Sequence, residues 1–324
     1  MTRRRFLHAT TACLAALALS GPAAAQPPAW PSRPVRVIVP FGAGSGNDLV
    51  ARLLAERLSR TLGQPFIVDN RVGANGSIGA DAVAHAAPDG YTLFVTTNTT
   101  QAANPSLMKR LNYDPIKDFA PIGRIANTPA LLVVHPSVPV RSVPELVALA
   151  KAQPGRLSYA SGSAGTLVPG AMLTSAAGID MLHVPYKTIP QALNDVIAGQ
   201  VQMMFTDMAT GLPQVKAGKV RAIGISSLQP AALLPEVPPI AATLPGFELL
   251  AWYALYAPAG TPQAVIERLG AQTRAAVADP ALRERFASMG LEPVGSTPQE
   301  LAAFGRSELE KWTRLIKAAG IQPE

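Results

Sequence analysis

Two glycine-rich turns have the composition of an anion-binding site. "GAGSG" occupies residues 42–46 and "SGSAGT" occupies residues 161–166, and each turn follows a strand pattern and precedes a helical one. Glycine lets the backbone approach a ligand closely, and the first N–H groups of a helix have no partner inside it. With the helix dipole, such groups bind a carboxylate or a phosphate. A plain strand-to-helix connection has the same composition, so the argument for a site comes from two turns in matching positions.

Other candidate ligand contacts are polar residues at the ends of predicted strands. Thr97 and Asn98 follow the strand pattern "YTLFVTT", Tyr186 follows "HVP", and Asp207 follows "QMMFT". Open α/β sheets bind ligands at the carboxyl ends of their strands, although ordinary loop packing is an equally good explanation for each residue. Trp252 and Tyr253 could stack on a ligand, but a place in the core is the better prediction for an aromatic pair in a strand.

Nucleotide binding fits the first turn poorly. A dinucleotide fingerprint needs glycine at its sixth position, where this chain has Asn47, although Asp69 ends the second strand about where a ribose-binding acid would lie. A phosphate-binding P-loop is excluded because no lysine follows the glycines. The basic residues are scattered along helix faces, which is typical of solvated surfaces and predicts no nucleic-acid partner.

Nothing in the sequence predicts a reaction centre, a metal site or a cofactor. The nearest approach to a Gly-x-Ser-x-Gly nucleophile motif is "NGSIG" at 75–79, which lacks the first glycine. His85, His135 and His183 have no metal-ligand spacing, and the acids show no paired arrangement for glycoside chemistry. No catalytic residue is therefore predicted.

Strand and helix patterns alternate along most of the chain. Val35, Val37 and Val39 alternate like a strand, and an amphipathic helix follows to Gly63. Further strands are predicted at "PFIVDN" and "YTLFVTT", which makes a βαβαβ unit with a mainly parallel sheet covered by helices. A second such unit begins near "PALLVVHP", and the proline-rich stretch 228–246 is interpreted as a crossing back to the first.

The N-terminal residues 1–25 are typical of an export signal. They have a basic start, an apolar stretch and "AAA" before Gln26, and the "TRRRFLH" segment leaves the twin-arginine and general export routes both open. Of 28 basic residues the segment holds three, so 25 basic against 21 acidic residues leave the mature part at +4. The single cysteine also lies in it, and no later stretch reaches the roughly 18 apolar residues of a membrane helix. We expect a periplasmic protein without disulfides.

The chain resembles the Bug family, the extracytoplasmic solute receptors of tripartite tricarboxylate transporters. The resemblance covers essentially the whole mature chain, in the family's order, and rests on these stretches: "WPSRPVRVIVPFGAGSGNDLVARLLAERL", "VDNRVGANGSIGADAVAHAAPDGYTL", "LSYASGSAGT", "HVPYK", "ALNDVIAGQVQMMFTD", "KAGKVRAIGIS" and "APAGTP". It implies a two-domain periplasmic-binding-protein (Venus flytrap) fold of the α/β class. Domain 1 would comprise 26–128 and 250–324, and domain 2 would comprise 129–249.

The resemblance also implies that a small organic carboxylate binds between the domains through backbone amides and ordered waters of the two turns. Asp48 is similar to the family's first-turn acid and is expected to stabilise its helix rather than contact an anion, which it would repel. The predicted ligand-binding residues are Phe41, Gly42, Ala43, Gly44, Ser45, Gly46, Thr97, Asn98, Ser161, Gly162, Ser163, Ala164, Gly165, Thr166, Tyr186 and Asp207.

The implied partners are the ligand and integral-membrane permease subunits, with the receptor itself a monomer. Departures from the family pattern lie at 166–173, where "TLVPGAML" replaces a segment with a polar histidine, and at Thr188, where glycine is usual. They suggest a less polar second domain and a ligand with an apolar end. An exported enzyme using the same cleft, or the ligand-sensing subunit of a signalling system, are the alternative functions.

Overall fold

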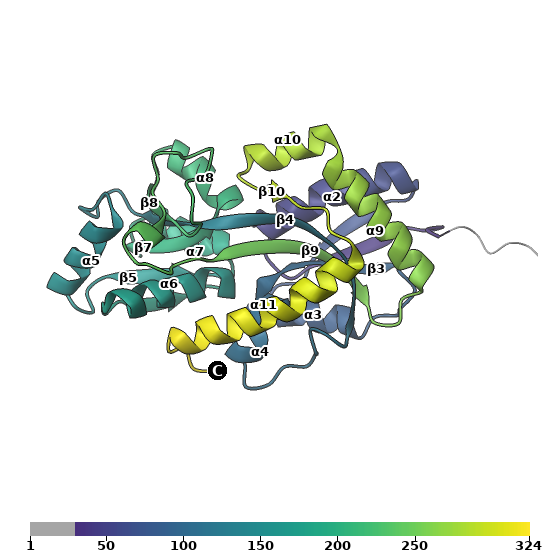
Figure 1. The fold of residues 1–324 in the computed structure, drawn as a ribbon, viewed down its shortest axis with the longest axis horizontal. Coiled ribbons are helices and arrows are strands. Elements are labelled where there is room, and N and C mark those ends of the chain that lie inside the picture. The colour runs from purple at the N-terminus through teal and green to yellow at the C-terminus, as the bar shows by residue number, and fades with distance from the viewer. Residues whose placement is uncertain (1–29) are drawn as a thin grey trace, which may run out of the picture. The chain divides into compact units, whose positions relative to one another are not determined.

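The computed structural model describes residues 30–324, so the predicted export signal lies outside the described residues. Residues 33–324 form one compact unit, to which the following description applies (Figure 1). Its strands are β1 (Val35–Val39), β2 (Phe66–Asn70), β3 (Thr92–Thr97), β4 (Phe119–Val134), β5 (Ser158–Ser161), β6 (Leu182–Pro185), β7 (Met203–Asp207), β8 (Arg221–Ile225), β9 (Leu250–Pro258) and β10 (Glu292–Pro293). The principal helices are α2 (Gly46–Leu62), α3 (Ser77–Ala84), α4 (Asn104–Leu107), α5 (Val143–Ala152), α6 (Ala164–Ala177), α7 (Ile189–Ile197), α8 (Met208–Lys216), α9 (Gln263–Ala278), α10 (Pro280–Ser288) and α11 (Pro298–Ala318).

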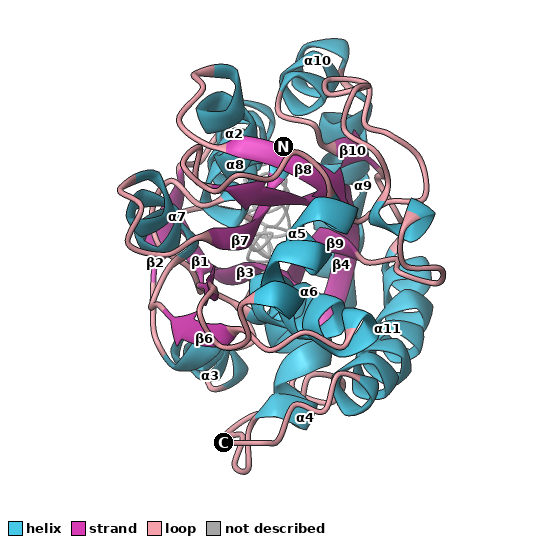
Figure 2. Ribbon diagram, turned by 90° about the vertical axis from the view of Figure 1, so that its left-hand side faces the viewer, coloured by secondary structure: helices cyan, strands magenta, loops and turns pink. Residues whose placement is uncertain are grey.

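The strands form a mixed sheet in the order β2-β1-β3-β9-β4-β7-β5-β6, with β8 and β10 also pairing with β4. Pairing is parallel among β1, β2 and β3 and among β5, β6 and β7. Strands β9 and β4 between these groups run antiparallel to their neighbours. Figure 2 shows helices on both sides of the strands, as expected when parallel segments are joined by helical crossovers.

Strand β4 changes partners in its middle. Residues Phe119–Pro129 pair with β9, whereas Ala130–Val134 pair with β7. We call β1, β2, β3, β9 and Phe119–Pro129 the first half-sheet, and β5, β6, β7, β8 and Ala130–Val134 the second half-sheet. The exchange of partners after Pro129 and the start of β9 at Leu250 coincide closely with the predicted domain boundaries. The division into two domains that move relative to each other remains a prediction.

Helix ends follow the capping signals in the sequence. The Ser45 side chain accepts a hydrogen bond from the Asp48 N–H, and Gly63 adopts the left-handed conformation at φ 72° that ends α2. Thr297 and Glu300 form a capping box at the start of α11. Pro280 is the first residue of α10, where proline is favoured, and Asp279 is its cap.

Three features of the fold differ from the sequence-based expectation. Strand β4 is sixteen residues long and extends well before "PALLVVHP", because register shifts near Pro121 and Gly123 accommodate residues that normally interrupt strands. Residues Thr99–Ala103 form a π-helical turn leading into α4, a segment for which no element was predicted. The βαβαβ pattern also predicts a helix over residues 77–87, and the observed α3 is shorter and ends at Ala84.

Helix α6 packs against residues of both half-sheets. Leu173 and Ala177 join the cluster around Phe205 and Phe247 in the second half-sheet, whereas Ala164 and Val168 join the cluster around Phe94, Trp252 and Trp312. The start of α6 is therefore held against the first half-sheet by apolar burial. Within residues 30–324, no helix is long and apolar enough to cross a membrane.

A buried glutamate links α11 to the first half-sheet. Oε2 of Glu308 accepts hydrogen bonds from Nε1 of Trp252, at 2.9 Å, and from Nε1 of Trp312, at 3.0 Å. Both indole rings are almost fully buried, which confirms the prediction that Trp252 belongs to the core. Nζ of Lys311 lies 3.8 Å from Oε1 of the same carboxylate.

We predict that Glu308→Ala lowers the free energy of unfolding by about 3 kcal/mol, because two buried indole N–H groups lose their acceptor. Glu308→Gln keeps an acceptor oxygen and should cost less than about half as much. Lys311→Ala removes only a long ion pair and should change stability by less than about 0.5 kcal/mol. Guanidinium denaturation followed by tryptophan fluorescence measures all three, and equal losses for the Ala and Gln variants would contradict the assignment.

Candidate functional site

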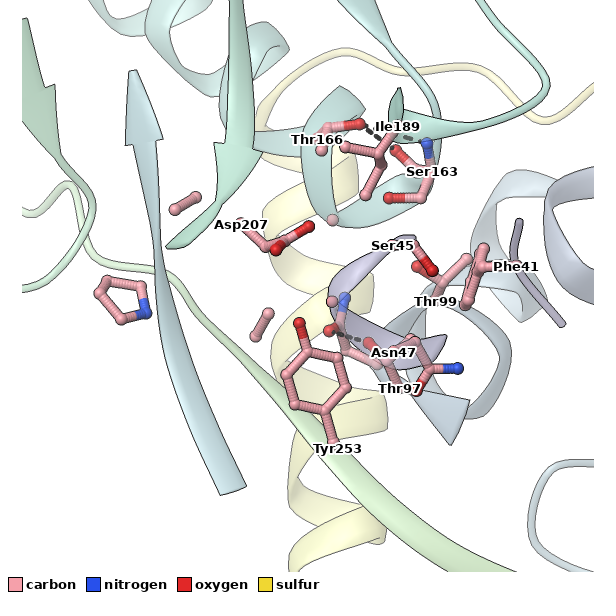
Figure 3. Close-up of a pocket in the computed structure, with 16 residues that line it drawn as sticks. Phe41, Ser45, Asn47, Thr97, Thr99, Ser163, Thr166, Ile189, Asp207 and Tyr253 are labelled. Carbon is pink, nitrogen blue, oxygen red and sulfur yellow. Dashed lines mark hydrogen bonds between the residues drawn. The ribbon is translucent and has the colours of Figure 1, made fainter. Parts of the chain in front are cut away.

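A narrow cavity lies where the two half-sheets meet (Figure 3). Its volume is about 40 Å³, which corresponds to a few water molecules at roughly 10–15 Å³ for each. The starts of α2 and α6, the ends of β3 and β7, and the junction of β4 with β9 supply its walls. The lining residues are Phe41, Ser45, Gly46, Asn47, Thr97, Asn98, Thr99, Pro129, Ala130, Ser163, Gly165, Thr166, Ile189, Asp207, Ala251 and Tyr253.

Most backbone donors at the start of α6 are already engaged by side chains of the protein. The N–H groups of Gly162 and Ser163 both donate to Oγ1 of Thr166, at 2.9 and 3.2 Å. Ala164 donates to Oδ1 of Asn75, at 3.1 Å. The next N–H, of Gly165, has no acceptor among the described residues, and the turn carries no acidic side chain to oppose the positive end of the helix dipole.

Asn98 aims a buried donor at the same turn. Its Oδ1 accepts a hydrogen bond from Oγ1 of Thr97, at 2.6 Å. Its Nδ2 is buried and has no partner among the described residues. A Cβ placed on Gly165 would lie 3.5 Å from this Nδ2 and 3.6 Å from Oγ of Ser163. The missing side chain of Gly165 thus leaves space in which two side-chain donors converge.

The position of Asn98 is set by the π-helical turn that follows it. All five residues of Thr99–Ala103 are buried, and the hydroxyl of Tyr113 donates to the carbonyl of Thr100 at 2.8 Å. Burial raises the pKa of Tyr113 well above its ordinary value, so the hydroxyl keeps the proton that it donates. Single π-helical turns occur often at functional sites, and this one begins directly after the unpartnered amide.

The first turn of α2 is already compensated by an acid of its own chain. Oδ2 of Asp48 accepts hydrogen bonds from the Gly44 N–H and from Nε of Arg52, each at 3.0 Å, and Nδ2 of Asn70 donates to Oδ1 at 2.9 Å. Burial alone would raise the pKa of Asp48, but these hydrogen bonds lower it below its ordinary value. Asp48 therefore has the helix-stabilising place expected for it, and it engages the Gly44 N–H that was predicted to face a ligand.

Asp207 lies against the start of α2 from the opposite half-sheet. A Cβ placed on Gly46 would lie 2.6 Å from Oδ1 of Asp207 and 2.5 Å from the hydroxyl oxygen of Tyr253. Figure 3 shows these two side chains converging on one wall of the cavity. Burial raises the pKa of Asp207, although hydrogen bonds from Thr210 and the Gly46 N–H oppose the shift. Burial and then the Asp207 charge raise the pKa of Tyr253 well above its ordinary value.

The structure brings nine of the predicted residues together in the cavity. They are Phe41, Ser45, Gly46, Thr97, Asn98, Ser163, Gly165, Thr166 and Asp207. Gly42, Ala43, Gly44 and Ala164 belong to the same turns but do not line it. The lining also contains residues that were not predicted, namely Asn47, Thr99, Ile189 and the β4–β9 residues. Tyr253, for which the core was predicted, is both buried and part of the wall. This tyrosine lies in the wall because β9 pairs antiparallel with β3 and β4, and no sequence motif predicts that pairing.

Ser161, Gly162 and Tyr186 line a second, larger cavity with a volume of about 700 Å³, which shares Ser163 with the first. Oγ of Ser161 lies 2.7 Å from Nε2 of His183 there. Burial lowers the pKa of His183, although the charge of Glu324 opposes the shift. The described residues contain no group of three or more His, Cys, Asp or Glu side chains that could hold a metal ion.

Asn75 connects the first half-sheet with α6. Four successive residues, from Gly73 to Gly76, have positive φ angles, among them Asn75 at 52°. The turn is held by Nδ2 of Asn75, which donates to Oδ1 of Asn104 at 2.9 Å, and by Nδ2 of Asn104, which donates to the Asn75 carbonyl at 3.0 Å. Asparagine tolerates the left-handed region better than most residues. The strained turn places the Asn75 side chain against the Ala164 N–H.

Comparison with known proteins places these features in a family. Residues 50–321 match the family described as "Tripartite tricarboxylate transporter family receptor". The chain is 33% identical over 328 residues to protein BugT of Bordetella pertussis, covering 99% of each chain. The structure of R. palustris Rpa4515 with adipate is similar at a TM-score of 0.89 and 33% identity, covering 91% of this chain and 100% of that one. MatC from Rhodopseudomonas palustris with bound malate is similar at 0.84 and 33%, covering 89% and 100%.

The Asn75 contact gives a prediction about closure of the cavity. Asn75→Gly keeps the left-handed turn accessible but removes the acceptor for the Ala164 N–H. The closed arrangement then loses a hydrogen bond worth about 1 kcal/mol, so ligand affinity should fall about fivefold. Isothermal titration calorimetry of the variant and the wild-type protein measures the change, and equal affinities would show that the Ala164 contact contributes nothing.

Proposed function

Because the chain belongs to the receptor family of tripartite tricarboxylate transporters, we propose that it captures a small organic acid in the cavity and delivers it to a membrane permease. The observation that carries this proposal is the unpartnered, buried Nδ2 of Asn98 beside the free N–H of Gly165. A buried donor without a partner costs about 1–3 kcal/mol, and a bound carboxylate oxygen removes that cost. The proposed carboxylate position is therefore the first turn of α6.

The backbone geometry of α6 supports this position. The N–H groups of Gly162 and Ser163 converge on Thr166 Oγ1, which holds the turn without adding a charge. A carboxylate at this point gains the partial positive charge of a helix start that no acidic side chain neutralises. The first turn of α2 offers less, because Asp48 and Asp207 already lie against it.

Ligand entry requires the two half-sheets to separate. A cavity of about 40 Å³ admits a few waters, and an organic acid of several carbon atoms is larger. The change of partners along β4 and the entry of the chain into β9 at Leu250 provide the two crossings about which domain 1 (26–128 and 250–324) and domain 2 (129–249) would open. Contacts such as Asn75 with Ala164 would form on closure.

The two structural neighbours support a carboxylate as the recognised group. Rpa4515 was solved with adipate and MatC with malate, and both ligands carry carboxylates. The family is one of receptors, which supports delivery to permease subunits and a periplasmic location. Removal of residues 1–25 on export, a monomeric receptor and the absence of catalysis complete the proposal.

A thermal-shift screen of the mature protein, freed of bound ligand by unfolding and refolding, tests the receptor function. The panel contains mono-, di- and tricarboxylates, hydroxy and amino acids, aromatic acids and uncharged controls. An acid at about 100 times its dissociation constant adds roughly 2.7 kcal/mol and should raise the Tm by several degrees. Stabilisation by uncharged compounds alone would contradict the proposal. Turnover of the acid that is lost in Ser161→Ala, Ser163→Ala or Asp207→Asn would favour an enzyme.

Asn98→Asp tests the carboxylate position. The variant keeps an oxygen to accept from Thr97 but replaces the free donor with an acceptor that repels an anion, so affinity for the best acid should fall at least about thirtyfold, or about 2 kcal/mol. Asn98→Ala removes the donor without adding a charge and should also weaken binding. Asn194→Asp makes the same chemical change at an exposed position of α7 and should bind normally. Undiminished affinity in both Asn98 variants would place the carboxylate elsewhere.

A further inference from the structure

The two ends of the cavity present opposite hydrogen-bonding groups. The α6 end presents donors, namely Nδ2 of Asn98 and the N–H of Gly165. The α2 end presents acceptors, of which the carboxyl group of Asp207 is the strongest. A ligand that spans the cavity therefore meets different chemistry at each of its ends.

Asn47 is the second acceptor at the α2 end. Its Nδ2 donates to the carbonyl of Val95 at 2.9 Å, and this contact fixes which side of the amide carries the oxygen. The oxygen, Oδ1, is buried and has no partner among the described residues, and the whole residue is only 3% exposed. Like the amide nitrogen of Asn98, it is a buried polar atom for which a bound ligand can supply the missing partner.

Asp207 is built into the wall rather than held at the surface. It is 8% exposed, it caps α8, and its oxygens accept hydrogen bonds of 2.9 Å from the N–H and the hydroxyl of Thr210. It faces Gly46 at the start of α2 and Tyr253 on β9. None of the residues that line the cavity is Lys, Arg or His. A second anion placed at this end would meet a carboxyl group with no cation to offset it.

We infer that the ligand is an organic acid with one carboxylate and, at its other end, a hydroxyl or ammonium group, and that Asp207 selects this donor end. The inference rests on the proposed function, because it takes the carboxylate to lie at the first turn of α6. The donor end would bond to Asp207 and to Oδ1 of Asn47, and would satisfy both acceptors together. A dicarboxylate of the same length is disfavoured by repulsion in a site of low dielectric constant.

Calorimetry at pH 7.5 with matched acids tests the inference. The four-carbon set is butanoate, 4-hydroxybutanoate, 4-aminobutanoate and succinate. The six-carbon set is hexanoate, 6-hydroxyhexanoate, 6-aminohexanoate and adipate. In the wild-type protein, the better of the hydroxy and amino acids should bind at least about tenfold more tightly than the dicarboxylate of its set. In Asp207→Asn, this preference should fall below about threefold, because the repelling charge is gone.

The variant should fold, because asparagine caps a helix as well as aspartate does. Asp207→Ser, another good capping residue, serves as a second neutral variant, and the Tm of each confirms folding. Tyr253→Phe removes a neighbouring hydroxyl but keeps the charge, so it should retain the preference against dicarboxylates. Wild-type binding of succinate or adipate as tight as that of the donor-bearing acids, or a preference unchanged in both Asp207 variants, would overturn the inference. Failure of every acid to bind would instead count against the receptor function.

Discussion

The whole site depends on the exchange of partners within β4. Up to Pro129 this strand pairs with β9, and from Ala130 it pairs with β7, so one continuous strand carries two half-sheets. The carboxyl ends of β3 and β7 reach the same region from opposite sides and bring Asn98 and Asp207 to a common cavity. Open α/β sheets bind ligands at such ends, and here the ends of two half-sheets face each other.

Burial then determines what each end of the cavity can bind. A buried polar atom without a partner is costly, and the cavity contains an unpartnered donor on Asn98 and an unpartnered acceptor on Asn47. The starts of the two helices differ in a corresponding way. The first turn of α6 contains no acidic residue, whereas the first turn of α2 contains Asp48. The charge of one bound carboxylate is thus favoured at α6 only. The asymmetry comes from residues around two turns that look alike in sequence.

Much of this could be predicted from sequence, because local signals determine it. Gly63 indicated the end of α2, and the strand ends indicated Asn98 and Asp207 as residues of the site. The family resemblance, carried by motifs along the mature chain, is confirmed by the family match and by the similar receptors.

The rest depends on contacts between distant segments. The length of β4 was not predicted because Pro121, Gly123 and Pro129 are residues that normally interrupt strands. In the structure, register shifts and the change of partner accommodate them. Tyr253 lies in the wall of the cavity because β9 pairs antiparallel with β3. The Gly44 N–H, which was predicted to bind the ligand, instead donates a hydrogen bond to Asp48.

The most direct measurement is a crystal structure of the mature protein with the acid that gives the largest thermal shift. The account predicts a carboxylate oxygen within hydrogen-bonding distance, about 2.7–3.2 Å, of both Nδ2 of Asn98 and the N–H of Gly165. A carboxylate bound instead at Gly44 and Gly46, or in the larger cavity beside Ser161 and Tyr186, would contradict it.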